Sequence, residues 1–180
     1  MKHIKIDDVD KGFDRINQEM QKLKGAELIV GVLEKDKQHP NSDLSFVDLA
    51  AVHEYGVKIQ VTEKMRGWFA FQGYPLSSEK KEIHIPERSF IRSTVDKKKE
   101  EIVKRGNELL ARVAIGRMKA STMMDKLGNY VVKKIRENID EVSQPPLTQM
   151  TVEMRNGSGE ASPLQDTGAL WQSIDYKVSW

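Results

Sequence analysis

The chain has 180 residues, of which 38% are hydrophobic and 31% charged, a balance typical of a folded globular protein that can bury a core of its own. Its 29 basic and 27 acidic side chains leave a formal net charge of +2, so the overall charge does not indicate a polyanionic partner. Cysteine is absent, which excludes disulfides, thiolate metal sites and a cysteine nucleophile. No apolar run has the length of a signal peptide or a membrane span, so no membrane contact is expected.

The first forty residues predict a helix, a strand and a loop. Apolar side chains recur every three or four positions from Val9 to Leu23, which is the spacing of one helical face. The β-branched run 26–33 follows and predicts a buried strand, because it is short and is bounded by a glycine and by charged residues. The polar residues 34–43 predict an extended loop.

The next forty residues predict a short helix and two strands around an irregular segment. Residues 45–55 carry one apolar face and begin at a serine, a typical N-cap, and Gly56 stands where a left-handed residue ends a helix. Alternation of apolar and polar side chains predicts a strand over 57–61, and a second strand over 81–85 stops at a proline. Between the strands, the glycine-punctuated residues 65–81 predict an extended loop.

The segment 65–81 is rich in aromatic side chains, namely Trp68, Phe69, Phe71 and Tyr74. Two interpretations are open at this point. The aromatic side chains belong to the core, or the segment packs on another subunit, since aromatic residues are enriched in protein interfaces.

Two long helices dominate the second half of the chain. Helical apolar seams run through 91–113 and through 124–142, and the short joint between them predicts an antiparallel pair. A short helix is expected after Pro146, then a flexible stretch over 156–162, and last a strand over 173–180.

These elements predict an α+β fold in one domain that spans residues 1–180. We expect a small, mostly antiparallel sheet packed against the two long helices, with the N-terminal helix as an addition.

The tripeptide Asp166-Thr167-Gly168 reads like the active-site turn of a retroviral-type aspartic protease. Such an enzyme needs two carboxylates, each on its own turn inside a β-rich scaffold. Only 12 residues follow Gly168, and the residues before Asp166 are mostly helical in pattern, so this interpretation is disfavoured.

A structural interpretation fits the same residues better. Asp166 can accept hydrogen bonds from backbone amides as a helix N-cap, with Thr167 as the alternative cap, and Gly168 permits a tight turn. Leu170 and Ile174 then share one face at a spacing of four residues.

No other pattern predicts catalysis. The four histidines are scattered, and the chain contains no HExxH motif, no glycine-rich phosphate loop and no nucleophilic serine motif. For His53 and Glu54, the favoured interpretation is a partly buried histidine beside a surface glutamate. We expect no enzyme, no cofactor and no metal.

The densest run of charge surrounds Lys97, Lys98 and Lys99. A solvated helix face is the favoured interpretation, because Glu100 and Glu101 follow directly and dilute the positive potential. The alternative is a strip of lysines that faces DNA.

Four short motifs follow one another along the chain, and together they extend over about residues 46–178. They are His53, Glu54, Tyr55 and Gly56; then Ile85, Pro86, Arg88 and Phe90; then Pro145, Pro146 and Leu147; and last Asp166, Thr167, Gly168, Leu170, Ser173 and Ile174. In this order the motifs resemble the phage neck and tail-completion (head–tail joining) proteins, which are related to the virion morphogenesis proteins of Mu-like and P2-like phages.

The resemblance implies a structural virion protein rather than an enzyme. Such a chain would form a homo-oligomeric ring, expected to be a hexamer, between the portal or connector and the tail tube, around a channel for the packaged DNA. It would lie in the neck or tail region of the virion after assembly in the host cytoplasm. A tail terminator ring is the alternative, and a DNA-binding module is a further one.

Elementary physics gives each motif a structural task under this interpretation. Pro86 ends a strand and forces a turn, and Phe90 then docks the following helix on the sheet. We expect Arg88 to pair with Glu54. The last strand completes a sheet edge or pairs with a neighbouring subunit, and the loops 34–43 and 65–81 serve as contact arms.

Overall fold

The computed structural model describes residues 11–33, 44–155 and 162–180. These residues form seven helices and four strands, which confirms the predicted α+β class. In chain order they are α1 (Lys11–Leu23), β1 (Glu27–Val32), α2 (Phe46–Tyr55), β2 (Val57–Gln60), α3 (Glu63–Phe71), β3 (Glu82–Ile85), α4 (Arg92–Ala114), α5 (Ala120–Glu141), α6 (Gln149–Met154), α7 (Ala169–Gln172) and β4 (Ile174–Ser179).

The strands form two separate antiparallel sheets of two strands each, where the sequence predicted one sheet. In the first sheet, β1 pairs with β4, with Val32 opposite Ile174, so the C-terminal strand completes a sheet within its own chain. In the second sheet, β2 pairs with β3, with Val57 opposite Ile85. The sheets are separate because β2 and β3 lead away from the helices and pair only with each other.

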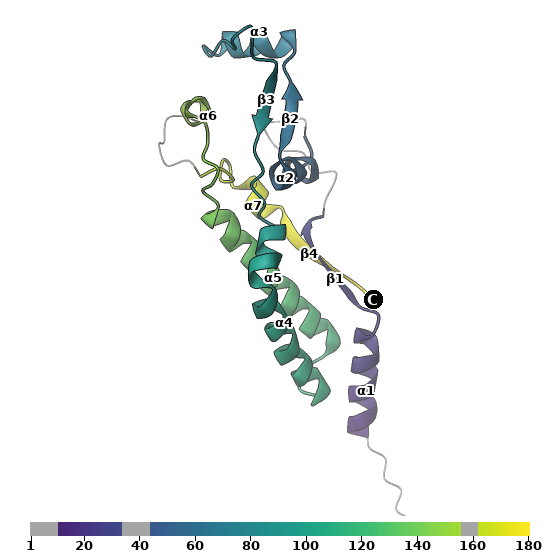
Figure 1. Ribbon diagram of the computed structural model, residues 1–180. Helices are drawn as coiled ribbons and strands as arrows, with labels where there is room; N and C mark the ends of the chain where they lie inside the picture. Colours follow the sequence, from purple (N-terminus) through teal and green to yellow (C-terminus); the bar gives the residue numbers. More distant parts are fainter. Residues whose placement is uncertain (1–10, 34–43, 156–161) are drawn as a thin grey trace, which may run out of the picture.

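The body of the molecule consists of the β1–β4 sheet and the long helices. Helices α4 and α5 lie side by side, joined by the short segment 115–119, and α5 covers one face of the sheet (Figure 1). The main core lies between these layers and includes the fully buried Phe90, Ile135, Ile139 and Ile174. Because only one face of the sheet is covered, β1 is half-buried rather than buried as predicted.

A second, smaller core lies where α1 meets the C-terminal end of α4 and the N-terminal end of α5. Leu109 and Val113 are fully buried there, and Met20 and Leu23 of α1 pack against them. The predicted helical seam of α4 is wrong at Val95, which is 45% exposed, because the neighbouring Thr94 faces the core in its place. Within the described residues, no helix is both long enough and apolar enough to cross a membrane.

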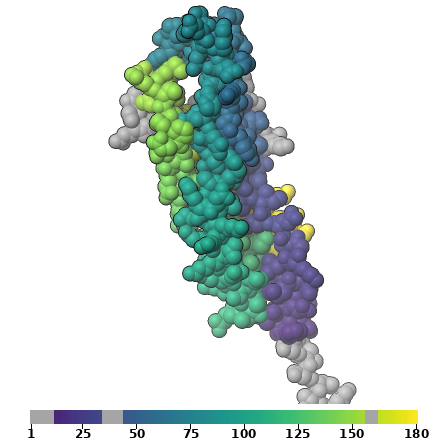
Figure 2. Space-filling model, in the orientation of Figure 1, coloured from purple at the N-terminus to yellow at the C-terminus, as the bar shows by residue number. Residues whose placement is uncertain are grey.

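Strand β2, helix α3 and strand β3 project from the body as an arm, which gives the molecule an elongated outline (Figures 1 and 2). The prediction of an extended loop over 65–81 is wrong for its first part, because residues 63–71 form α3. The Thr62 hydroxyl caps this helix by accepting a hydrogen bond from the Met65 amide at 3.2 Å. The interior Gly67 lowers helix propensity by only about 1 kcal/mol, which the cap and packing offset.

Two further predictions concern segments that lie outside the described residues. They are the extended loop 34–43 and, apart from Ser162, the flexible stretch 156–162.

Candidate functional site

Glu54 lies at the junction between the arm and the body, where the C-terminal end of α2 meets the start of α4. One carboxylate oxygen accepts hydrogen bonds from the amides of Phe90 at 2.9 Å and Ile91 at 3.0 Å. The other accepts from the Arg92 amide at 2.8 Å and the Ser89 hydroxyl at 2.7 Å. The first amides of a helix have no partner within the helix, so Glu54 satisfies them and its negative charge complements the helix dipole.

The Glu54 side chain is buried, with 4% of the residue exposed, which corrects the expected surface glutamate. Burial raises the pKa of Glu54, but hydrogen bonds from Ser89 and from three backbone amides outweigh it, so the pKa lies below its ordinary value. The carboxylate is therefore ionised at neutral pH and holds the start of α4 as an anion.

The predicted pair between Arg88 and Glu54 is wrong. The ion-pair partner of Glu54 is Arg92, whose Nε lies 3.2 Å from the carboxylate. Arg88 is buried, with 6% of the residue exposed, and binds the turn at Pro145 instead of Glu54. Its Nε donates to the carbonyl of Pro145 at 2.7 Å, and a terminal nitrogen donates to the carbonyl of Pro146 at 2.9 Å. Arg88 thus binds backbone carbonyl oxygens rather than a carboxylate. These hydrogen bonds link the second motif, which contains Arg88, to the third, which contains Pro145 and Pro146.

Gly56 and Pro86 turn the chain into and out of the arm. Gly56 has φ 68°, and a Cβ atom there would lie 2.8 Å from the Glu87 nitrogen and 3.0 Å from the Ile85 oxygen. The position therefore requires glycine for both conformation and space. Strand β3 ends at Ile85, directly before Pro86, as the sequence predicts. The base of the arm is thus a close backbone crossing.

Phe90 anchors this crossing to the core. Its side chain is fully buried, as predicted for a residue that docks α4. Its carbonyl accepts a hydrogen bond from the Asn138 side chain at 3.0 Å, and Asn138 also donates to the Ser93 hydroxyl at 2.8 Å. Asn138, a buried amide in the last turn of α5, escaped the sequence analysis because nothing in its surroundings along the chain marks it as buried.

The C-terminal motif has a different cap from the one expected. The Asp166 carboxylate lies 3.5 Å from Nε of Arg155 and forms an ion pair with it. The Thr167 hydroxyl, the alternative cap, accepts a hydrogen bond from the Ala169 amide at 3.3 Å. Gly168 has φ 73° at the start of α7, which confirms the tight turn. The N-cap of α7 is Gly168, which makes no side-chain cap hydrogen bond, so the expectation that Asp166 is the cap, with Thr167 as the alternative, is wrong.

The apolar part of the same motif behaves as predicted. Leu170 and Ile174 are both buried in the main core. Beside them, the Arg136 guanidinium stacks over the Trp171 ring at 4.3 Å and donates to the carbonyls of Trp171 and Ile174. The motif thus fastens the start of β4 to α5.

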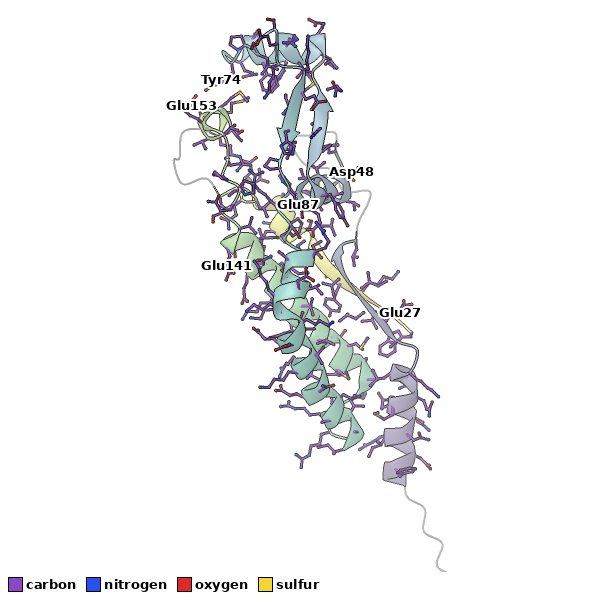
Figure 3. The ribbon with its side chains drawn as sticks, viewed as in Figure 1. Glu27, Asp48, Tyr74, Glu87, Glu141 and Glu153 are labelled. Carbon is purple, nitrogen blue, oxygen red and sulfur yellow. The ribbon has the colours of Figure 1, made fainter. Side chains whose placement is uncertain are left out.

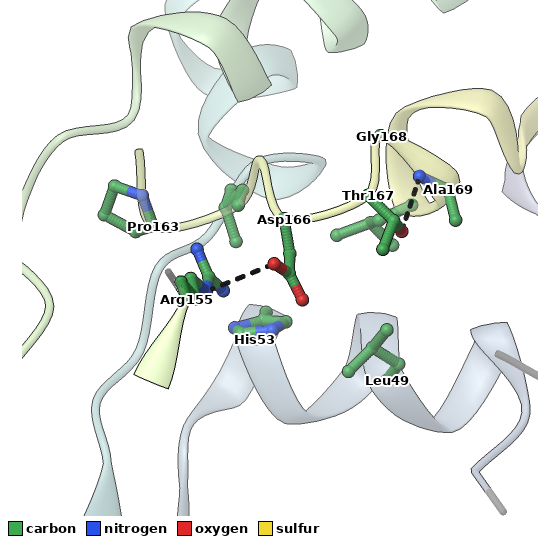
Figure 4. Close-up of a pocket in the computed structure, with 10 residues that line it drawn as sticks. Leu49, His53, Arg155, Pro163, Asp166, Thr167, Gly168 and Ala169 are labelled. Atoms are coloured by element: carbon green, nitrogen blue, oxygen red, sulfur yellow. Dashed lines mark hydrogen bonds and ion pairs between the residues drawn. The ribbon is translucent and has the colours of Figure 1, made fainter. Parts of the chain in front are cut away.

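A cavity of about 220 Å³ lies between α2 and the C-terminal motif, lined in part by His53, Arg155 and Asp166 (Figure 4). Nδ1 of His53 is buried and has no hydrogen-bond partner among the described residues. Burial, followed by the charges of Arg88 and Arg155, lowers the pKa of His53 to about 4. The imidazole is therefore neutral at pH 7, and no group of three metal-ligating side chains occurs in the described parts of the chain.

The three lysines on α4 differ in their contacts. Lys98 forms an ion pair with Glu101 at 2.9 Å, and Nζ of Lys97 lies 3.5 Å from the Asn138 side chain. Lys97 and Lys99 are exposed. This arrangement matches a helix face of mixed charge more closely than a continuous basic strip.

Helix α3 at the end of the arm carries two exposed aromatic side chains. Phe71 is 87% exposed and Trp68 is 49% exposed, and none of the described side chains of α3 is fully buried. The aromatic segment is therefore outside the core, and the alternative that it contacts another subunit stays a prediction. An exposed apolar helix on a projecting arm is typical of an interaction surface.

A second feature missed by the sequence analysis is the contact of Gly128 with Tyr176. A Cβ atom at Gly128, in the middle of α5, would clash with the ring of Tyr176 on β4. The Tyr176 hydroxyl donates to Asp125 at 3.3 Å and accepts from Asn129 at 3.2 Å. A glycine inside an otherwise regular helical pattern is the signal that could have indicated this close approach.

Comparisons with protein families, with curated proteins and with solved structures give no match for this chain.

Proposed function

We propose that this chain is a structural subunit of the phage neck that joins head to tail as part of a homo-oligomeric ring. The observation that carries the proposal is the arm, which presents exposed Trp68 and Phe71 on α3 while its base is fixed to the body through buried Glu54. A subunit that works by association needs an apolar surface held in a defined position, and the arm has both properties.

The residues of the four motifs support this proposal through what they contact. Glu54, Gly56, Arg88 and Phe90 join α2, the arm, α4 and the turn at Pro145 in one buried junction. Their described contacts are with the chain itself, so their task is to orient the arm. The ring would lie between the connector and the tail tube, with packaged DNA passing through it.

Deletion of the gene from a phage genome that encodes the chain tests the proposal. We expect DNA-filled heads and tails of normal length that stay unattached, and labelling of complemented virions should place the chain in the neck. Overlong tails would instead assign the chain to the tail terminator ring. Normal infectious virions without the chain would contradict both the joining function and the terminator function.

DNA binding is tested separately on the purified protein. If Lys97, Lys98 and Lys99 form the working surface of a DNA-binding module, affinity for duplex DNA should fall steeply with salt and with neutral substitutions of the three lysines. In a neck subunit, these substitutions should leave the joining of head and tail unchanged.

A further inference from the structure

The tip of the arm, defined as residues 63–81, combines exposed aromatic side chains with positive charge. Phe71 and Trp68 are the exposed aromatic residues, and Ile59 on the neighbouring strand β2 is 37% exposed. The tip contains four basic side chains and two acidic ones, namely Lys64, Arg66, Lys80, Lys81, Glu63 and Glu79. A partner that fits the tip should therefore offer an apolar hollow with a negative surround.

Two sets of contacts hold the tip in shape. Arg66 donates to the carbonyl of Ser77 at 2.8 Å and to that of Lys80 at 2.7 Å, which ties α3 to the returning chain. Tyr74 lies beside Glu153 of α6, which raises the pKa of Tyr74, and Figure 3 shows the two side chains close together. A preorganised tip loses little conformational entropy on docking.

The same chain contains an apolar groove of about 200 Å³ at the base of the arm. Its apolar lining comes from the end of β1, from α2 and from the start of α4, and consists of Val32, Val47, Ala50, Ala51, Tyr55 and Ile91. Two charged residues line the groove, Glu54 and Arg92. Asp48 on α2 and Glu87, which pairs with Arg92, lie beside it (Figure 3). Because Glu54 is buried and paired with Arg92, the exposed carboxylates of Asp48 and Glu87 are the groups that make this surround negative.

The groove cannot receive the tip of its own arm. Figure 1 places α3 at the far end of the β2–β3 hairpin from α2. A strand rises about 3.3 Å per residue, so the four residues of β2 separate tip and groove by roughly 13 Å. The tip that fits the groove belongs to another molecule.

We infer that the tip of one copy docks in the groove of the next copy, with the Phe71 side chain entering between α2 and α4. The inference rests on the proposed ring and names the contact that builds it. A protrusion that fits a hollow elsewhere on the same surface makes a head-to-tail contact, which repeats from copy to copy and closes into a ring when the rotation permits. The apolar surfaces and the opposite charges of tip and groove match each other.

Two single substitutions test the contact by light scattering on the purified full chain. Phe71→Asp places a carboxylate on the tip, and Ala51→Arg fills the groove and repels the basic tip; both positions are exposed, so folding should persist. The wild type is expected at a multiple of 20.6 kDa, and each variant at 20.6 kDa. The matched control is Val103→Asp, at a 53% exposed position of α4, which should keep the wild-type mass.

A mixture of the two variants distinguishes this contact from other modes of association. The Phe71→Asp protein keeps an intact groove and the Ala51→Arg protein keeps an intact tip, so the mixture should form a one-to-one dimer and nothing larger. A monomeric wild type, an unchanged mass of either variant, or a mixture that stays monomeric overturns the inference. The chain could be found in the neck of virions while its mass in solution is unchanged by both substitutions. That result would support the proposed function and contradict this contact.

Discussion

The base of the arm buries charged side chains, whereas the tip exposes aromatic ones. At the base, each oxygen of the buried Glu54 carboxylate has at least two donors, and Arg88 is buried against two carbonyls. At the tip, Phe71 and Trp68 lie largely in solvent. The base therefore contributes to folding, whereas the side chains of the tip contribute little to it. Substitutions at the two regions should separate stability from association.

The largest effect on stability is expected from Glu54→Ala. The variant leaves the first amides of α4 without their acceptor, which should cost about 3 kcal/mol of the free energy of unfolding, measured in urea. Glu54→Gln, which keeps the shape and loses the charge, should cost less. Because the folded-state pKa of Glu54 is lowered, the advantage of wild type over Glu54→Gln should be present at neutral pH and fade as the pH falls below about 4.5. Equal stability of all three proteins at pH 7 would contradict the anchoring role.

Patterns of sequence predicted the elements and the buried apolar side chains better than the polar contacts. The helices α2, α4 and α5 and all four strands follow from periodicity, and Phe90, Leu170 and Ile174 are buried as expected. Helix α3 was missed because its glycine and its aromatic residues resemble a loop.

The partners of Glu54, Arg88 and Asp166 could not be predicted, for a physical reason. Each takes its partner from a segment far away in sequence or from backbone groups, and backbone amides and carbonyls are present at every position. Sequence spacing therefore cannot select among them. The Gly128–Tyr176 contact has the same origin, since the register of β4 against α5 brings the ring to the glycine.

The next largest effect is expected where α5 meets β4. Gly128→Ala brings a methyl group against the Tyr176 ring and should cost about 2 kcal/mol from overpacking, despite the better helix propensity of alanine. Gly106→Ala in α4 is the matched control, because the nearest atom to its added Cβ would be 3.8 Å away, and it should gain up to about 1 kcal/mol. In the double variant Gly128→Ala/Tyr176→Ala, most of the overpacking should disappear.

The cavity between α2 and the C-terminal motif gives an effect that depends on pH. Since the pKa of His53 falls from 6.5 to about 4 on folding, the unfolded chain binds a proton in this range that the folded chain does not. Stability should therefore fall as the pH falls from 6.5 to 4, by at most about 1.4 kcal/mol per pH unit from this residue. His53→Gln should flatten the dependence, measured by urea unfolding at a series of pH values. An unchanged slope in His53→Gln would show that folding leaves the pKa of His53 unchanged and would contradict the burial of a neutral imidazole.

The C-terminal turn should respond weakly, and to the threonine more than to the aspartate. Thr167→Ala removes the acceptor of the Ala169 amide and should lower the free energy of unfolding by about 1 kcal/mol. Asp166→Asn removes only a half-exposed ion pair with Arg155, which is worth about 0–1 kcal/mol. Thermal unfolding of the two variants side by side measures the difference. A larger loss in Asp166→Asn would show that the ion pair with Arg155 contributes more to this turn than the threonine hydroxyl does.

The smallest effect on stability is expected at the tip of the arm. Phe71 is 87% exposed, so Phe71→Ser removes almost no buried apolar area and should change the free energy of unfolding of the monomer by less than about 0.5 kcal/mol. Urea unfolding at low protein concentration, where copies are dissociated, isolates this quantity from association. At higher concentration, an associating wild type gains stability by mass action, and Phe71→Ser should not. If Phe71→Ser destabilises the chain equally at both concentrations, the side chain stabilises the monomer itself, and the division between a folding base and an associating tip fails.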